Sequence, residues 1–342
     1  MNLNKTYKLT FLILIIVLVF CFVLNLSLGS VSIPFSELIN SLYGHSDNEN
    51  WTYIIQNYRL PKAITAILVG SGLGSSGLLM QTLFKNPLAG PYVLGITSGA
   101  SLGVAILILG SSLFGGFLAT VLASNWSLVI ASSLGSFLVL LTVLLVANKV
   151  KDTMTLLIIG LMFGSLTSAI VSVLSYFSPA DQLQQYIFWG FGSLGDLSWE
   201  KIKIFLVIFL IGLILSITAL KSLNSLLLGD QYAKSLGLNI ERNRYIIIIA
   251  ASLLAGSITA FAGPIAFIGL AVPHLTRQLF KTSSHSILLP AVILFGAILM
   301  LVCDSIAQLP SSDYTLPINA ITSLIGAPVV IWLLVRKKQM SF

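Results

Sequence analysis

Residues 86–148 read NPLAGPYVLGITSGASLGVAILILGSSLFGGFLATVLASNWSLVIASSLGSFLVLLTVLLVAN, and none of these 63 positions carries a charged residue. A membrane-spanning helix needs about 20 mostly apolar residues, because about 30 Å of hydrocarbon is crossed at about 1.5 Å per residue. The stretch is therefore long enough for two spans, separated by Ser, Gly and Asn around 110–125. We expect helices over 92–110 and 126–147, and hence a membrane protein.

The rest of the chain has the same apolar character on both sides of this stretch. Charged residues make up 8% of the 342 positions and hydrophobic residues 56%, whereas a soluble domain carries about 25% charged residues. This composition excludes a soluble enzyme and predicts an all-α polytopic membrane protein. The uncharged stretches predict ten transmembrane helices, at 11–28, 61–84, 92–110, 126–147, 153–176, 200–220, 245–262, 263–276, 287–306 and 315–335.

The distribution of basic residues predicts the orientation. An even number of spans puts both termini on one side, which then holds 14 of the 18 basic residues, five at the termini and nine in loops. Basic residues concentrate in the cytoplasmic segments of membrane proteins. Both termini are therefore expected in the cytoplasm, and the net charge of +7 reflects this asymmetry, not affinity for nucleic acid.

The sequence lacks the patterns of nucleotide-binding, metal-binding and catalytic sites. Gly72-Leu-Gly74-Ser-Ser-Gly77 matches a dinucleotide-binding pattern, but it lies in an apolar helix with no strand before it. Small residues that allow close helix packing are the better interpretation. The sequence contains no P-loop and no cluster of metal-ligating residues, and Cys21 and Cys303 are expected to be packing residues. We expect no catalytic residue, metal or cofactor.

Three charged residues at the outer side leave two interpretations each. Arg59 and Lys62 flank Pro61 at the start of the second span. They either dock an acidic partner outside the cell or extend their charged ends to the membrane interface. Asp304 lies near the outer end of the predicted helix 287–306, and it serves either a structural hydrogen bond or a proton relay.

Residues 221–244 form the only substantial inner loop that the ten-helix prediction leaves. The loop mixes Leu and Ala with Asp, Lys and Arg, and it is long enough for two short helices. Such a segment either docks a cytosolic partner by helix-in-groove packing or lies on the lipid surface.

These segments, in this order, resemble the FecCD-type permease family of ABC importers, which takes up iron–siderophores and vitamin B12. The resemblance covers almost the whole chain and rests on an ordered set of motifs: Arg59-Leu60-Pro61-Lys62, Gln81, Asn86-Pro87-Leu88-Ala89-Gly90-Pro91, Gly95, Gly99-Ala100, Gly229-Asp230, Ala233, Leu236-Gly237, Gly263-Pro264, Phe267, Gly269, Pro273-His274, Arg277, Asp304, Leu316-Pro317 and Gly326-Ala327-Pro328.

The resemblance implies a type II ABC importer permease, with residues 1–342 forming one transmembrane domain in the bacterial cytoplasmic membrane. It implies a second permease subunit (the pair being a homo- or heterodimer), two cytosolic ATPase subunits and an extracellular substrate-binding lipoprotein. The expected cargo is an iron(III)–siderophore, with haem or cobalamin as alternatives.

The resemblance also implies roles for particular residues. Arg59 and Lys62 would dock the binding lipoprotein, and helices 153–176, 181–196 and 315–335 would line the translocation path. The residues expected to couple to the ATPase are Gly229, Asp230, Ala233, Ser235, Leu236 and Gly237. Translocation-path and structural-motif residues would be Gln81, Asn86, Pro87, Gly263, Pro264, Pro273, His274, Arg277, Asp304 and Pro317.

The sequence departs from the family pattern at three positions. Lys62 replaces a second Arg, and Gln308 and Thr315 stand where the family typically has Arg and Glu. One docking contact or internal salt bridge of the family is therefore in question.

Two further hypotheses concern architecture and class. Residues 1–176 and 200–335 would each hold five helices and form an inverted pair, with Arg59 to Gly70 resembling Arg244 to Gly256. The rival class is an ion-coupled secondary carrier, which predicts carboxylates at mid-membrane. Asp304, near a helix end, fits that class poorly.

Overall fold

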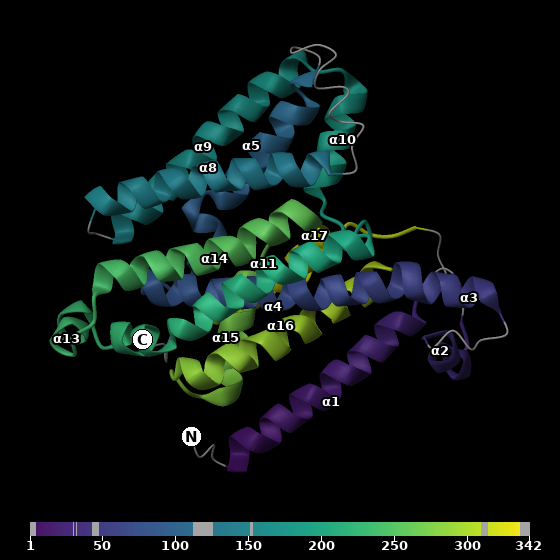
Figure 1. The fold of residues 1–342 in the computed structure, drawn as a ribbon, viewed down its shortest axis with the longest axis horizontal. Helices are drawn as coiled ribbons and strands as arrows, with labels where there is room; N and C mark the ends of the chain where they lie inside the picture. The colour runs from purple at the N-terminus through teal and green to yellow at the C-terminus, as the bar shows by residue number, and fades with distance from the viewer. Residues whose placement is uncertain are drawn as a thin grey trace. The chain divides into compact units, whose positions relative to one another are not determined.

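The computed structural model describes residues 5–29, 31, 33–42, 48–111, 126–150, 153–308 and 314–335 (Figure 1). Within these ranges the regular structure is helical and contains no strand. The elements are α1 (Lys5–Ser27), α2 (Phe35–Leu42), α3 (Glu49–Ile54), the π-helical η1 (Ile55–Arg59), α4 (Leu60–Leu83), the 3-10 helix η2 (Pro91–Leu94), α5 (Ile96–Ile108), α8 (Ser127–Lys149), α9 (Thr153–Phe177), α10 (Ala180–Gly190), α11 (Trp199–Thr218), α12 (Leu220–Leu227), α13 (Asp230–Ser235), α14 (Ile240–Ala262), α15 (Ile268–Phe280), α16 (His285–Ala307) and α17 (Ile318–Val335).

The predicted all-helical membrane fold is confirmed. A helix overlaps each of the ten predicted ranges, and among the described residues 7 helices are long and apolar enough to cross a membrane. Two shorter apolar helices, Ile96–Ile108 and Ile318–Trp332, accompany them. The ten-span count and the cytoplasmic placement of both termini stay predictions. The basic residues 336–338, the Ser, Gly and Asn residues at 112–125 and His45 lie outside the described residues.

The predicted helix 263–276 has the wrong boundaries, because α15 begins at Ile268 and continues to Phe280. Gly263 ends α14 with φ +76 and ψ −179, and Pro264 has no backbone N–H to donate into a helix. Phe267 precedes α15 with φ +65. Residues 263–267 therefore form a non-helical connection between α14 and α15.

The chain forms two compact units that are built from interleaved segments. The first comprises Met1–Leu78, Ser193–Val207 and Ile265–Phe342, and the second Leu79–Gly192 and Ile208–Pro264. Helices α4 and α11 contribute residues to both units. The division of the sequence into inverted halves 1–176 and 200–335 stays a prediction.

Glycines bring helix backbones into direct contact in the first unit. A Cβ added to Gly70 would lie 2.1 Å from the carbonyl oxygen of Gly296, and one added to Gly77 would lie 1.6 Å from that of Gly269. Helix α4 therefore packs on α16 and α15 at distances that no side chain allows. The interpretation of Gly72 to Gly77 as a packing motif is confirmed at Gly77.

The second unit repeats this packing between α5 and α8, and between α9 and the 3-10 helix η2. A Cβ added to Gly99 would lie 2.5 Å from the carbonyl oxygen of Gly135, and one added to Gly103 would lie 2.1 Å from that of Ala131. A Cβ added to Gly160 would lie 1.9 Å from the carbonyl oxygen of Val93. Figure 1 shows α5, α8 and α9 side by side, consistent with their mutual contacts. In both units, small residues fix the spacing of the helices.

Substituting Gly77 with Ala tests this packing. The added methyl group must displace the α15 backbone, and we expect a loss of about 1–3 kcal/mol in folding stability. Thermal unfolding of the purified protein in detergent measures the loss. Gly256→Ala in α14 is the matched control, since its Cβ would meet its nearest neighbour at 3.5 Å, an ordinary contact. Equal unfolding temperatures for the two variants would contradict the packing argument.

Candidate functional site

The predicted inner loop folds into two short helices, α12 and α13, as expected. Helix α12 buries Leu223 and Leu226, and α13 buries Ala233 completely. Leu228, Tyr232 and Leu236 nevertheless expose 64%, 52% and 59% of their surface. The segment is thus anchored by one face and presents large apolar side chains on the other.

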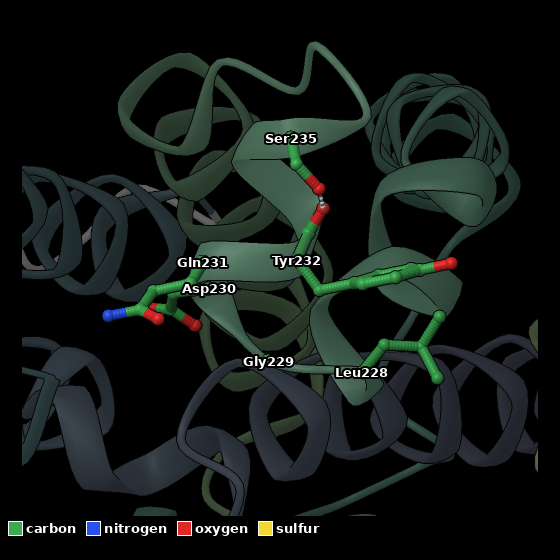
Figure 2. A pocket seen from close by; sticks show the side chains of 6 residues that line it. All are labelled: Leu228, Gly229, Asp230, Gln231, Tyr232 and Ser235. Carbon is green, nitrogen blue, oxygen red and sulfur yellow. Dashed lines mark hydrogen bonds between the residues drawn. The ribbon is translucent and has the colours of Figure 1, made fainter.

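A hollow of about 550 Å³ lies on this segment and is lined by Leu228, Gly229, Asp230, Gln231, Tyr232 and Ser235. Figure 2 shows the side chains of Leu228 and Tyr232 extending to one side, and those of Asp230 and Gln231 to the other. The Ser235 hydroxyl donates to the carbonyl oxygen of Tyr232 at 2.8 Å. The surface therefore combines apolar contact area with hydrogen-bonding groups, as an interface for another protein does.

Glycines bound α13 at both ends. Gly229 precedes it with φ +102 and Gly237 follows it with φ +81, a conformation that glycine adopts without steric cost. The N–H of Leu238 bonds to the carbonyl oxygen of Ala233 at 3.1 Å, which closes the helix. A Cβ added to Gly237 would meet no atom within 4 Å. The backbone conformation, not lack of space, therefore favours glycine here.

Polar contacts hold the segment within its unit. The Lys85 ammonium lies 2.7 Å from an oxygen of Asp230, at the start of α13. The Ser222 hydroxyl on α12 donates to the side-chain oxygen of Asn243. The side chain of Asn239 caps α14 by accepting from the N–H of Arg242 at 2.9 Å. Lys85 lies between Gln81 and Asn86, two residues of the family motifs.

Arg59, predicted to dock an outer partner, is bonded within the chain. It is 9% exposed, and its guanidinium donates to the carbonyl oxygens of Leu26 at 2.9 Å, Ser27 at 3.0 Å and Val31. The first two carbonyls end α1, where the helix itself offers them no donor. Arg59 therefore caps α1, and its docking role stays a prediction.

Lys62 and Asp304, two of the predicted site residues, form an ion pair at 3.1 Å. The second oxygen of Asp304 accepts hydrogen bonds from Asn25 at 2.9 Å and Gln308 at 2.8 Å. Asp304 is 1% exposed, so its negative charge is balanced and hydrogen-bonded. This geometry supports the structural interpretation of Asp304. It also gives Gln308, a departure from the family pattern, a defined partner.

The other predicted site residues occupy turns and helix interiors. Gln81 is buried, and Asn86 accepts from the N–H of Leu88 at 2.9 Å in the turn that follows α4. His274 and Pro273 are buried in α15, which also contains Arg277. Pro317 precedes α17. Among the described residues no group of three or more His, Cys, Asp or Glu could hold a metal ion.

Comparison with known proteins decides the family. Residues 16–336 match the model of the FecCD transport family. The chain belongs to this family. It is 34% identical over 327 residues to the hemin transport system permease protein HmuU of Yersinia pestis, covering 95% of both chains. It is 37% identical over 287 residues to the vitamin B12 import system permease protein BtuC of Klebsiella pneumoniae, covering 83% of both.

Solved structures agree with this assignment. An inward-facing metal-chelate type ABC transporter matches with a TM-score of 0.81 and 33% identity, over 97% of this chain and 99% of the other. PsaBC from Streptococcus pneumoniae matches with a TM-score of 0.55 and 16% identity, over 87% and 95%, which indicates the fold alone. The chain is therefore a multi-pass FecCD permease of a bacterial ABC importer in the inner membrane. Such permeases pair with another permease, with separate ATPase subunits and with a binding protein.

Replacing Asp304 with Asn tests the outer ion pair. Lys62 then loses its anionic partner, and we expect a loss of about 1–3 kcal/mol in stability, because Lys62 keeps some access to solvent. Thermal unfolding in detergent measures it, with the exposed Asp196→Asn as the matched control. A variant that unfolds at the temperature of this control would show that the pair does not stabilise the permease.

Proposed function

We propose that this FecCD permease forms the membrane path of an ATP-driven importer for an iron(III)–siderophore. The exposed surface of α12 and α13 carries the proposal, since it combines large apolar side chains with a hollow. ATP hydrolysis in the partner subunits would displace this segment and alternate the permease pair between outward-open and inward-open states. The metal-chelate type transporter of similar structure supports a chelate as cargo.

Haem is the second candidate for the substrate. The hemin permease HmuU matches 95% of this chain. Cobalamin is the third, on the similarity to BtuC. All three are large organic metal complexes, and the same coupling mechanism serves each of them.

We further propose that α9 and α10 contribute to the translocation path. Helix α9 contains no charged residue, and Ser165, Ser168 and Ser172 expose their side chains on it. The Ser172 hydroxyl donates to the carbonyl oxygen of Ser168 at 2.8 Å. Hydroxyl and apolar side chains along the path would bind a large metal complex weakly, so that the complex can be released.

We also propose that the binding protein docks at this end of α4, chiefly through Lys62 and less through Arg59. Lys62 keeps 22% of its side chain exposed while it pairs with Asp304. The Arg59 guanidinium is more deeply buried and bonded to α1. An acidic partner would therefore meet Lys62 in preference to Arg59.

Uptake by the complete reconstituted complex tests the function. Proteoliposomes that contain the permease, the ATPase subunits and the binding protein are supplied with single iron(III)–siderophores, hemin or cobalamin. We expect ATP-dependent accumulation of a siderophore and none of the other two. Accumulation of hemin or cobalamin alone would replace the substrate assignment. Accumulation that continues without the ATPase subunits would contradict the mechanism.

Gly237→Trp tests the coupling role of the α13 segment. The side chain must be held at φ +81 and would project from the end of α13 into open space, where a docked partner would be. We expect uptake to be abolished while the amount of permease in the membrane stays normal. Ile130→Trp on α8 is the control for added bulk, since Ile130 is 53% exposed and lies outside both the coupling segment and the proposed path. Normal uptake by Gly237→Trp would remove the coupling role from this segment.

A further inference from the structure

Lys85, in the turn that follows α4, has a backbone conformation that its side chain disfavours. Its φ is +47, in the left-handed region where glycine is strongly preferred. The conformation closes α4: the N–H of Asn86 bonds to the carbonyl oxygen of Gln81 at 3.1 Å, and that of Lys85 to Thr82 at 3.2 Å. A glycine would make this turn without a steric cost, so the presence of a long cationic side chain calls for an explanation.

The side chain of Lys85 reaches α13. Its ammonium lies 2.7 Å from Asp230, in the first turn of that helix. Both side chains are about half exposed, at 45% and 55%. An ion pair of this exposure adds little to folding stability, and the left-handed backbone opposes that gain. Stability therefore does not explain why Lys, rather than Gly, occupies the position.

Helix α4 is continuous from Leu60 to Leu83 and is closely packed along most of its length. The helical stretch Glu49–Leu83 has an 18-residue window that is 89% buried, the largest share among the candidate spans of the described residues. Its backbone contacts other helices directly at Gly70 and Gly77, and such closely packed backbones resist bending. A displacement at the Lys85 end of α4 would therefore be passed along the helix.

We propose that Lys85 is a positioning residue for coupling, which ties the start of α13 to the inner end of α4. Movement of α13 against its cytosolic partner then pulls or pushes α4 through the Lys85–Asp230 pair. The proposal rests on the proposed importer function and adds to it the point at which movement of α13 enters the transmembrane helices.

Lys85→Gly tests the proposal, because it improves the turn and removes the contact. We expect the variant to be at least as thermally stable as the wild type, with uptake about fivefold slower in the complete reconstituted complex and more ATP hydrolysed per substrate imported. A merely structural role for Lys85 predicts normal uptake from a stable protein. Lys85→Arg keeps the charge and should restore coupling.

Lys281 provides a matched control elsewhere in the chain. It also follows a helix, α15, in the left-handed conformation, with φ +48, and is exposed. Among the described residues no ion pair is recorded for its ammonium group. Lys281→Gly should therefore be at least as thermally stable as the wild type, like Lys85→Gly, but should take up substrate at the wild-type rate. An equal loss of uptake in both variants would overturn the specific role of Lys85.

A double-mutant cycle with Asp230→Asn completes the test. If the two residues act as a pair, Lys85→Gly/Asp230→Asn should slow uptake no more than the more impaired single variant. Losses that multiply would show independent roles and overturn the proposal. Failure of the importer function itself is distinguishable, since the wild-type complex would then show no ATP-dependent uptake.

Discussion

Hydrocarbon offers no hydrogen bonds, so each backbone N–H and C=O in the membrane must find its partner inside the protein. Helices satisfy this constraint along their length and fail it at their ends. Two buried arginines supply donors at such ends. Arg59 bonds to the end of α1, and Arg244 bonds to the carbonyl oxygen of Val150, after α8, at 2.9 Å. These are the arginines that begin the two similar sequence stretches, and their shared role fits the hypothesis of inverted halves.

Much of the fold could be predicted because hydrophobicity depends on local sequence. The ten apolar ranges and the two short helices of the inner loop follow from charge-free length and amphipathic composition. Helices α2 and α3 were missed, since short polar helices give no such signal. The extent of α15 was wrong at both ends. Its start depends on the left-handed Phe267, and its last turn contains Arg277 and Gln278, which end the apolar pattern.

The residues of the candidate site could be predicted from local sequence, but their contacts could not. The sequence identified the α13 segment by its glycines and mixed composition, and it marked Arg59, Lys62 and Asp304 as unusual charges. It could not give their partners, because Asn25 and Asp304 are 279 positions apart and meet only through packing of α1 on α16. Arg59 and Lys62, whose docking role outside the cell stays a prediction, also bond to groups inside the chain. The exposed surface of α12 and α13 is suited to protein contact, since it combines large apolar side chains with hydrogen-bonding groups.

Site-specific photo-crosslinking from Tyr232 in native membranes tests the central claim that α13 contacts the ATPase. Tyr232 is 52% exposed, and Ile130 on α8, at 53%, serves as an equally exposed control. A photoreactive amino acid at position 232 should form an adduct with the ATPase subunit whose yield changes when ATP is bound, and position 130 should form none. Absence of an ATPase adduct from position 232, in membranes where the complex is assembled, would contradict the account.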